Sequence, residues 1–279
     1  MTDGLLLVRK PKGITSHDAV DLVRMALGTK KVGHAGTLDP MAEGLLLMGV
    51  GRATRLLRFL SELDKEYEGT IRLGVETDTL DAEGTVLGTA EVAVDEHGIR
   101  EVMASLTGEI EQRPPAYSAV KVGGRPLHRA ARRGEGVEAP VRRVRVDAFD
   151  LLRTALPDLD VRVVCSSGTY VRVLAADLGS ALGCGAHLTR LERVRIGPFP
   201  VSDADPPESP SLRALEEAVG HLPRVTVEEE EAAAARHGRP LAPSGRGLHS
   251  VFDPEGRLVG VYRDDGAKAR PEVVIPSPD

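Results

Sequence analysis

An aspartate in a glycine-rich stretch is the residue of this sequence best suited to nucleophilic or acid–base chemistry. Asp39 lies in the run 31–44, whose glycines permit backbone conformations that other residues avoid. Leu38 and Met41 flank the acid and are expected to hold it against apolar material, with His34 nearby. An Asp-Pro pair by itself is an ordinary turn between two elements. The whole run instead predicts a carboxylate presented at a functional site.

Four other segments form an ordered set with this run. The run Gly33–Leu46 resembles the catalytic motif of the TruB family, the bacterial pseudouridine synthases that act on the T-loop uridine of tRNA. The resemblance continues in the same order and with similar spacing through about residue 200. Its other segments are Lys10–Asp18, Lys65–Tyr67, Gly168–Arg172 and Gly183–Leu191.

This resemblance implies a reaction that needs neither a cofactor nor a metal. Uridine 55 of tRNA would become pseudouridine when the glycosidic C–N bond breaks, the uracil rotates, and its C5 joins the sugar carbon. Asp39 takes the catalytic role, either as nucleophile on the sugar or base or as the base that removes the C2′ proton, and the sequence leaves these routes open. The resemblance pairs Arg172 with Asp39. Because a guanidinium favours the charged form of a neighbouring carboxylate, Arg172 is expected to keep Asp39 ionised.

Several positions are expected to hold the RNA. The target base must be flipped out of the T-loop into a pocket, which requires a stacking face and groups that stabilise the displaced nucleotides. The resemblance implies that Tyr67 stacks on the target base during catalysis and that His34 stabilises the displaced nucleotides. Tyr170 and Leu191 match positions at the target nucleotide. Lys10 is expected either to order the Asp39 loop or to meet the RNA.

Charge is segregated along the chain. The net charge of −6 and the pI near 5.8 would by themselves argue against a nucleic-acid partner, but these averages hide a basic and an acidic segment. Residues 113–145 contain nine Lys or Arg and two acids, whereas residues 203–231 contain nine acids and two Arg. The first segment predicts an RNA-binding arm at about 113–145 that contacts phosphates through Arg129, Arg132 and Arg133. A solvated charged surface is the alternative. The expected partner is the T-stem-loop of tRNA.

Composition predicts a cytoplasmic, water-soluble protein. A chain of 279 residues with 41% hydrophobic content can bury a large core. Cys165 and Cys184 have no metal-ligand spacing and make a poor disulfide framework. The start of the sequence lacks a signal-peptide pattern, and no window approaches a membrane span. We expect a monomer without an obligate protein partner.

The periodicity of the sequence predicts an α+β fold, because strands and helices alternate without βαβ regularity. The resemblance implies the pseudouridine-synthase fold, with a central mixed, mostly antiparallel sheet, flanking helices and a cleft. Residues 1–222 are expected to form the catalytic domain and 223–279 a small β-rich, PUA-like domain. Ser16 is expected to be the N-cap of a helix that ends at Gly28. A helix at 53–63 is expected to point arginines 52, 55 and 58 outward, with Arg55 able to meet phosphate. We also expect a structured turn at 77–84 and helices at 125–133 and 211–220.

Two other functional classes are compatible with parts of the sequence. A non-catalytic RNA-binding module would need the basic segment but would have no reason to keep Asp39 and Arg172 together. An aspartate-dependent glycoside hydrolase would need a second carboxylate, and the sequence offers none at an identifiable spacing.

Overall fold

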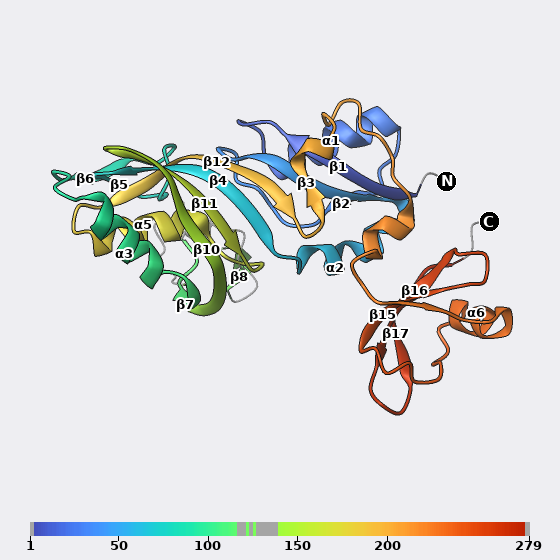
Figure 1. The fold of residues 1–279 in the computed structure, drawn as a ribbon. Helices are drawn as coiled ribbons and strands as arrows, with labels where there is room; N and C mark the ends of the chain where they lie inside the picture. Colours follow the sequence, from blue (N-terminus) through green and yellow to red (C-terminus); the bar gives the residue numbers. More distant parts are fainter. Residues whose placement is uncertain (1–2, 116–120, 123–124, 127–138, 277–279) are drawn as a thin grey trace.

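One nine-stranded sheet forms the centre of the larger part of the molecule (Figure 1). The computed structural model describes residues 3–115, 121–122, 125–126 and 139–276. The main strand order is β1-β3-β12-β4-β11-β10-β7, with β2 beside β3 and β13 beside β12; β3 and β12 run parallel and the other pairs antiparallel. The α+β prediction with a mixed, mostly antiparallel sheet is confirmed. The strands are β1 (Gly4–Lys10), β2 (Val32–His34), β3 (Glu43–Val50), β4 (Lys65–Leu73), β7 (Gly108–Gln112), β10 (Arg142–Ala155), β11 (Asp158–Cys165), β12 (Ala186–Ile196) and β13 (Phe199–Pro200).

Strands β1 and β3 are apolar on both faces because helices cover both sides of them. Leu6 and Leu46 face the helix α1 (Ser16–Leu27). Leu5 and Leu47 face the opposite way, toward the 3₁₀ helix η1 (Gly51–Leu56) and the short helix α2 (Leu57–Ser61). Successive side chains of a strand point to opposite faces, so a continuous apolar run fits only a strand that is covered twice.

The other half of the sheet packs against two helices on one face (Figure 1). They are α3 (Glu96–Ser105) and α5 (Val171–Ala181). Ile99 of α3 and Leu174 of α5 share a buried cluster with Ile71 and Val161 from the sheet. The long strands β4 and β12 pass through both halves and join them.

The start of α1 differs by one residue from the prediction, and the difference matters for the site. Thr15, rather than Ser16, is the N-cap and forms a capping box with Asp18. Gly28 ends the helix in the left-handed conformation, as expected. The Ser16 hydroxyl is thereby available for a contact outside the helix.

Two short hairpins and several minor elements complete the larger part. The hairpins are β5 (Val75–Thr77) with β6 (Val86–Thr89), and β8 (Lys121–Val122) with β9 (Arg125–Pro126). Arg125 therefore lies in a strand and does not begin the expected helix, while Arg129, Arg132 and Arg133 fall outside the described residues.

Two 3₁₀ helices follow β13: η2 (Val201–Asp203) and η3 (Leu215–Val219). Residues 211–220 form only η3, so the expected α-helix there is wrong. Within the described ranges, no helix is long and apolar enough to cross a membrane.

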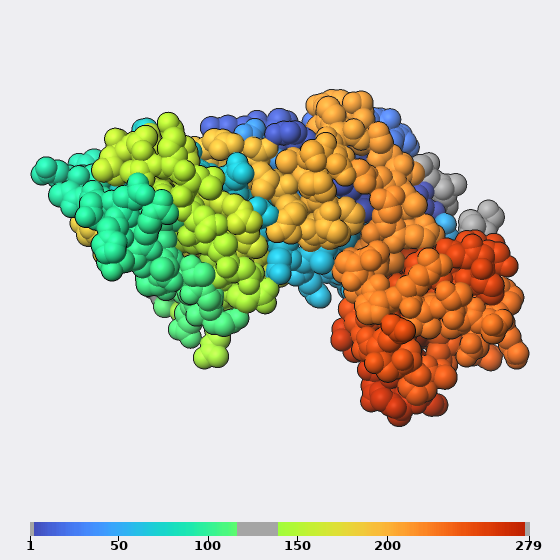
Figure 2. All heavy atoms as spheres, viewed as in Figure 1, coloured from blue at the N-terminus to red at the C-terminus, as the bar shows by residue number. Residues whose placement is uncertain are grey.

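A second, four-stranded sheet follows at the C-terminal end and lies at the opposite end of the molecule from α3 and β10 (Figure 2). Its strands occur in the order β14-β15-β16-β17, with α6 packed on the sheet. The buried Tyr262 hydroxyl donates to the carbonyl of Ala235 at 3.0 Å and so links the sheet to α6. The elements are β14 (Arg224–Thr226), α6 (Glu229–Arg236), β15 (Leu248–Phe252), β16 (Leu258–Asp264) and β17 (Ala269–Val274).

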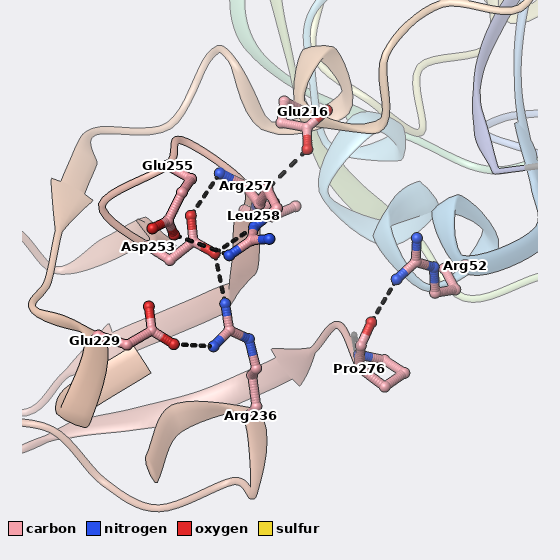
Figure 3. Close-up of polar contacts among 9 residues, drawn as sticks. All are labelled: Arg52, Glu216, Glu229, Arg236, Asp253, Glu255, Arg257, Leu258 and Pro276. Carbon is pink, nitrogen blue, oxygen red and sulfur yellow. Dashed lines mark hydrogen bonds and ion pairs between the residues drawn. The ribbon is translucent and has the colours of Figure 1, made fainter. Parts of the chain in front are cut away.

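A row of three arginines fastens this second sheet to η1 and α2. Arg52 donates to the carbonyl of Pro276, Arg55 donates to that of Val274 at 2.7 Å, and Arg58 pairs with Glu272 at 2.7 Å. Figure 3 shows the Arg52 contact and a second link nearby, from the Leu258 amide to Glu216. A step of three residues along the helices thus matches a step of two along β17 and the residues just after it. Arg55, which was expected to be able to meet phosphate, donates to Val274 in this row.

We predict that replacing Arg52, Arg55 and Arg58 with Ala loosens the second sheet without unfolding the first. Hydrogen bonds from charged groups contribute more than neutral ones, but partial exposure reduces the value, so a loss of about 1–3 kcal/mol in local stability is expected. Hydrogen exchange should accelerate in β17 and not in β4. Arg100→Ala together with Arg153→Ala, which breaks two exposed ion pairs, is the matched control. Unchanged exchange in β17 would contradict the prediction.

Candidate active site

A cavity of about 1040 Å³ lies where the two halves of the larger sheet meet, and five of the seven predicted site residues in the described part of the chain line it. The loop 36–40, the turn residues 79–83 and the segment 166–172 line it, together with side chains of β4 and β12. Residues from several separate parts of the chain therefore converge on one space. The predicted residues among them are Asp39, Tyr67, Tyr170, Arg172 and Leu191.

The Asp39 loop is held in place by the start of α1. The buried Ser16 hydroxyl accepts a hydrogen bond from the Leu38 amide at 2.8 Å and donates to the Leu38 carbonyl at 3.0 Å. On the other side of the acid, the Gly13 amide donates to the Pro40 carbonyl at 2.8 Å. Leu38 and Met41 are buried, as expected. The loop thus presents Asp39 from a fixed backbone.

The carboxylate of Asp39 forms an ion pair with a buried arginine. Arg172 Nε lies 2.9 Å from Asp39 Oδ2, and the Arg172 side chain is 4% exposed whereas that of Asp39 is 37% exposed. The same guanidinium lies 3.2 Å from Asp81 Oδ2 and donates to the Thr79 carbonyl at 2.7 Å. Because Arg172 is held from behind, its remaining face is directed to Asp39. The structure therefore brings together the two residues that the sequence paired.

Asp81 is a carboxylate of this site that the sequence did not identify. The turn predicted at 77–84 is present, but Asp81 within it is buried, and its Oδ1 accepts hydrogen bonds from the Thr79 hydroxyl and the Glu83 amide. Both oxygens are thus engaged, so Asp81 is placed to orient Arg172 and not to act as a separate general acid. The three acids of the segment were the available signal. Their partner, Arg172, lies ninety-one residues away in sequence, which the local pattern does not reveal.

Opposing effects set the protonation of Asp39. Burial raises the pKa of its carboxyl above the ordinary value, and the charge of Asp81 adds to that effect. Arg172 and Lys10 act in the other direction and lower the pKa. The sequence expectation that Arg172 favours ionised Asp39 thus has the right sign, but burial outweighs the arginine.

Tyr67 and Tyr170 give the cavity two rings, and Leu191 adds an apolar surface. Tyr67 is buried on β4, and burial raises the pKa of its hydroxyl.

Gln112, like Asp81, is a residue of the site that the sequence did not single out, and it fixes the backbone of Tyr170. The buried Gln112 accepts from the Tyr170 amide at 3.0 Å and donates to its carbonyl at 3.4 Å.

Two predicted residues lie outside the cavity lining. Lys10 is 0% exposed, and its ammonium donates to the carbonyls of Pro11 and Ile14 at 2.9 and 2.7 Å. Of its two expected roles, this placement fits ordering of the segment beside the Asp39 loop and does not fit contact with RNA. Burial lowers the pKa of Lys10 to about 8. His34 ends β2, two residues before the cavity-lining Gly36, and burial lowers its pKa.

A second cluster of acids, formed by α6 and the turn between β15 and β16, is a salt-bridge network (Figure 3). Asp253 is fully buried and pairs with Arg257 at 2.7 Å and with Arg236. Glu229 and Glu255 pair with the same two arginines at 3.1 and 2.8 Å. Since each acid already has a cationic partner, the cluster is explained by structure.

Sequence and structure comparisons place the chain in a family. Residues 24–171 match the model of the TruB family pseudouridylate synthase N-terminal domain, residues 172–228 the tRNA pseudouridylate synthase B C-terminal domain, and residues 222–276 the tRNA pseudouridine synthase II C-terminal model. The chain is 48% identical to the tRNA pseudouridine synthase B of Aromatoleum aromaticum, over 95% of this chain and 90% of that protein. It is 45% identical to the protein of the same name from Mycobacterium sp. (strain KMS), over 98% and 96%.

Solved structures agree in fold. A Cbf5-Nop10-Gar1 complex contains a chain with a TM-score of 0.75 and 27% identity, covering 98% of this chain and 85% of that one. An H/ACA RNP bound to a substrate RNA containing 2′-deoxyuridine gives 0.74 and 25%, covering 99% and 86%. Fold and family match are thus those of a pseudouridine synthase. The chain belongs to the TruB family of these enzymes.

We predict that Asp81→Asn slows turnover while leaving RNA binding intact. The neutral amide keeps the shape of the turn but weakens its hold on Arg172, so the rate at saturating tRNA should fall by roughly tenfold or more, with affinity within about threefold. Tritium release from tRNA labelled at uracil C5 measures the rate. Asp78→Asn, an exposed aspartate of the same turn, is the control and should behave as the wild type. Equal rates for Asp81→Asn and the control would show that Asp81 does not support Arg172 in catalysis.

A second prediction concerns pH. If ionised Asp39 is the active form, the rate at saturating tRNA falls on the acid side at a higher pH than an ordinary aspartate would give, because the pKa of Asp39 is raised. Removing the Asp81 charge lowers that pKa. In Asp81→Asn the acid limb should therefore move to lower pH even though the plateau is reduced. A shift to higher pH would mean that loss of Arg172 positioning outweighs the removed charge.

Proposed function

We propose that this protein isomerises uridine 55 in the T-loop of tRNA to pseudouridine. The observation that carries the proposal is the Asp39–Arg172 ion pair in the lining of a cavity that Tyr67 also lines. The 45–48% identity to proteins named tRNA pseudouridine synthase B supports tRNA as the substrate. A non-catalytic RNA-binding module is disfavoured, because it would gain nothing from a carboxylate kept ion-paired inside a cavity.

The proposed reaction is an intramolecular transfer. The bond between N1 of uracil and C1′ of the ribose breaks, and a bond between C5 and C1′ forms. N1 gains a proton and C5 loses one to solvent, so no electrons enter or leave. Asp39 acts either as the nucleophile or as the base at C2′, and Arg172 holds its carboxylate in position for either route.

Substrate positioning is assigned to the walls of the cavity. We propose that Tyr67 packs on the flipped base and that Tyr170 and Leu191 bound the same nucleotide. His34 is proposed to support the displaced nucleotides from beside the loop. Arg129, Arg132 and Arg133 remain proposed phosphate contacts. Among the described residues of the same basic segment, Arg142 lines the cavity.

A division into two domains accompanies this proposal. Residues 1–222 are proposed as the catalytic domain, including the arm at about 113–145, and residues 223–279 as the PUA-like domain. The separate C-terminal sheet and the family match at 222–276 support a boundary near residue 222.

Asp39→Asn tests the proposed function directly. The neutral isostere keeps the shape of the side chain and removes the nucleophile or base, so tritium release from C5-labelled, unmodified tRNA should be abolished. Binding of tRNA should stay within about threefold of the wild type. Asp21→Asn, an exposed aspartate of α1, serves as the matched control and should remain active. Full activity of Asp39→Asn would refute the proposal. Wild-type activity should also survive dialysis against EDTA.

A further inference from the structure

Arg193 is a buried arginine beside the cavity to which the sequence gave no role. It lies on β12 directly opposite Tyr67 of β4, and its side chain is among the largest that are fully buried, with 1% exposed. Cross-strand neighbours of this kind point to the same face of the sheet. Arg193 also lines the cavity. It is therefore placed between the stacking ring and the Asp39 loop.

The guanidinium of Arg193 contacts the Asp39 loop on both sides of the acid. It donates to the carbonyls of Gly36 at 3.1 Å and Thr37 at 3.4 Å, which precede Asp39. It also donates to the carbonyl of Leu45 at 2.7 Å, which follows Asp39 on β3. One side chain thus ties both ends of the loop to β12, the strand that pairs with β4 at Tyr67.

The backbone geometry makes this connection tight. Arg193 is the parallel register partner of Gly44, whose φ is +103°. A Cβ on Gly44 would lie 2.5 Å from the Arg193 carbonyl oxygen, so only glycine fits between the two strands. The end of the Asp39 loop is thereby pressed directly onto the residue whose side chain holds its beginning.

Among the described residues, the charge of Arg193 is buried without an ion-paired carboxylate, which argues for a role beyond packing. In the described ranges no Asp or Glu forms an ion pair with Arg193. Two lysines lie close enough for Arg193 to lower their pKa values, although burial is the larger cause: Lys10 and Lys65 both have a pKa of about 8. Burying a guanidinium without an ion-paired carboxylate is costly. Locally unfavourable features of this kind concentrate at functional sites.

We propose that Arg193 is a positioning residue for the isomerisation. Its fork of donors sets the Asp39 loop relative to Tyr67, so that carboxylate and ring address the same flipped base. This inference rests on the proposed function. A lysine cannot replace the arginine in this role, because an ammonium is a point charge and cannot span carbonyls from both ends of the loop.

The test compares Arg193→Lys and Arg193→Met with Arg195→Met. Arg195 lies on the same strand, pairs with Glu66 at 2.8 Å, and lines no part of the cavity, so it controls for loss of an arginine from β12. Tritium release is measured in single turnovers, with the enzyme in excess over tRNA and at a concentration that saturates binding. The affinity for tRNA and thermal unfolding are measured alongside. We expect the rate per folded molecule to fall at least about tenfold in both Arg193 variants, with affinity within about threefold. The Arg195 variant should match the wild type.

Hydrogen exchange separates positioning from simple stability. In Arg193→Lys the amides of residues 35–42 should exchange faster, while those of α3 remain unchanged. A wild-type rate in the folded Arg193 variants, a rate that falls only in proportion to the folded fraction, or unaltered exchange in the loop would each overturn the inference. A wild-type protein that releases no tritium would instead refute the proposed function, so the two failures are distinguishable.

Discussion

The buried guanidinium of Arg172 is the constraint to which the rest of the site conforms. Removing one partner from a buried ion pair costs roughly 3–5 kcal/mol, because the other charge is left uncompensated. Three chain segments must therefore converge: the loop with Asp39, the turn with Asp81, and the first turn of α5. Gly13 and Ser16 fix the first of these, and the hydrogen bonds inside the turn fix the second. The geometry of the acid is thus determined before any substrate arrives.

The large sheet explains why these segments meet where they do. Strands β4 and β12 extend through both halves, so residues on their central parts are flanked by two separate cores. Tyr67, Leu191 and Arg193 all lie in this central stretch. A rigid, doubly covered sheet offers the precision that a site on loops alone lacks, and the one functional loop is tied back to it.

Whether a feature could be predicted from the sequence depended on how far apart its interacting residues lie along the chain. Asp39, Tyr67 and Arg172 were recognisable because each lies in a compact motif, and the apolar runs of β1 and β3 required burial on both faces. The roles of Asp81 and Arg193 depend on partners far along the chain, and a buried Lys10 resembles a surface lysine in sequence. Ser16 was recognised as a helix-start residue, but a shift of the cap by one position freed its hydroxyl for Leu38. Short-range patterns thus located the chemistry, while its supporting residues required the fold.

The arginine row on β17 also has a consequence for association between molecules. β17 is the edge strand of its sheet, and unpaired backbone groups on such an edge invite pairing with a strand from another chain. Arg55 occupies the carbonyl of Val274 at the end of β17, Arg52 occupies that of Pro276 just after the strand, and Pro271 within the strand lacks an amide donor. The contacts that fasten the second sheet to α2 and η1 therefore also protect its edge against aggregation.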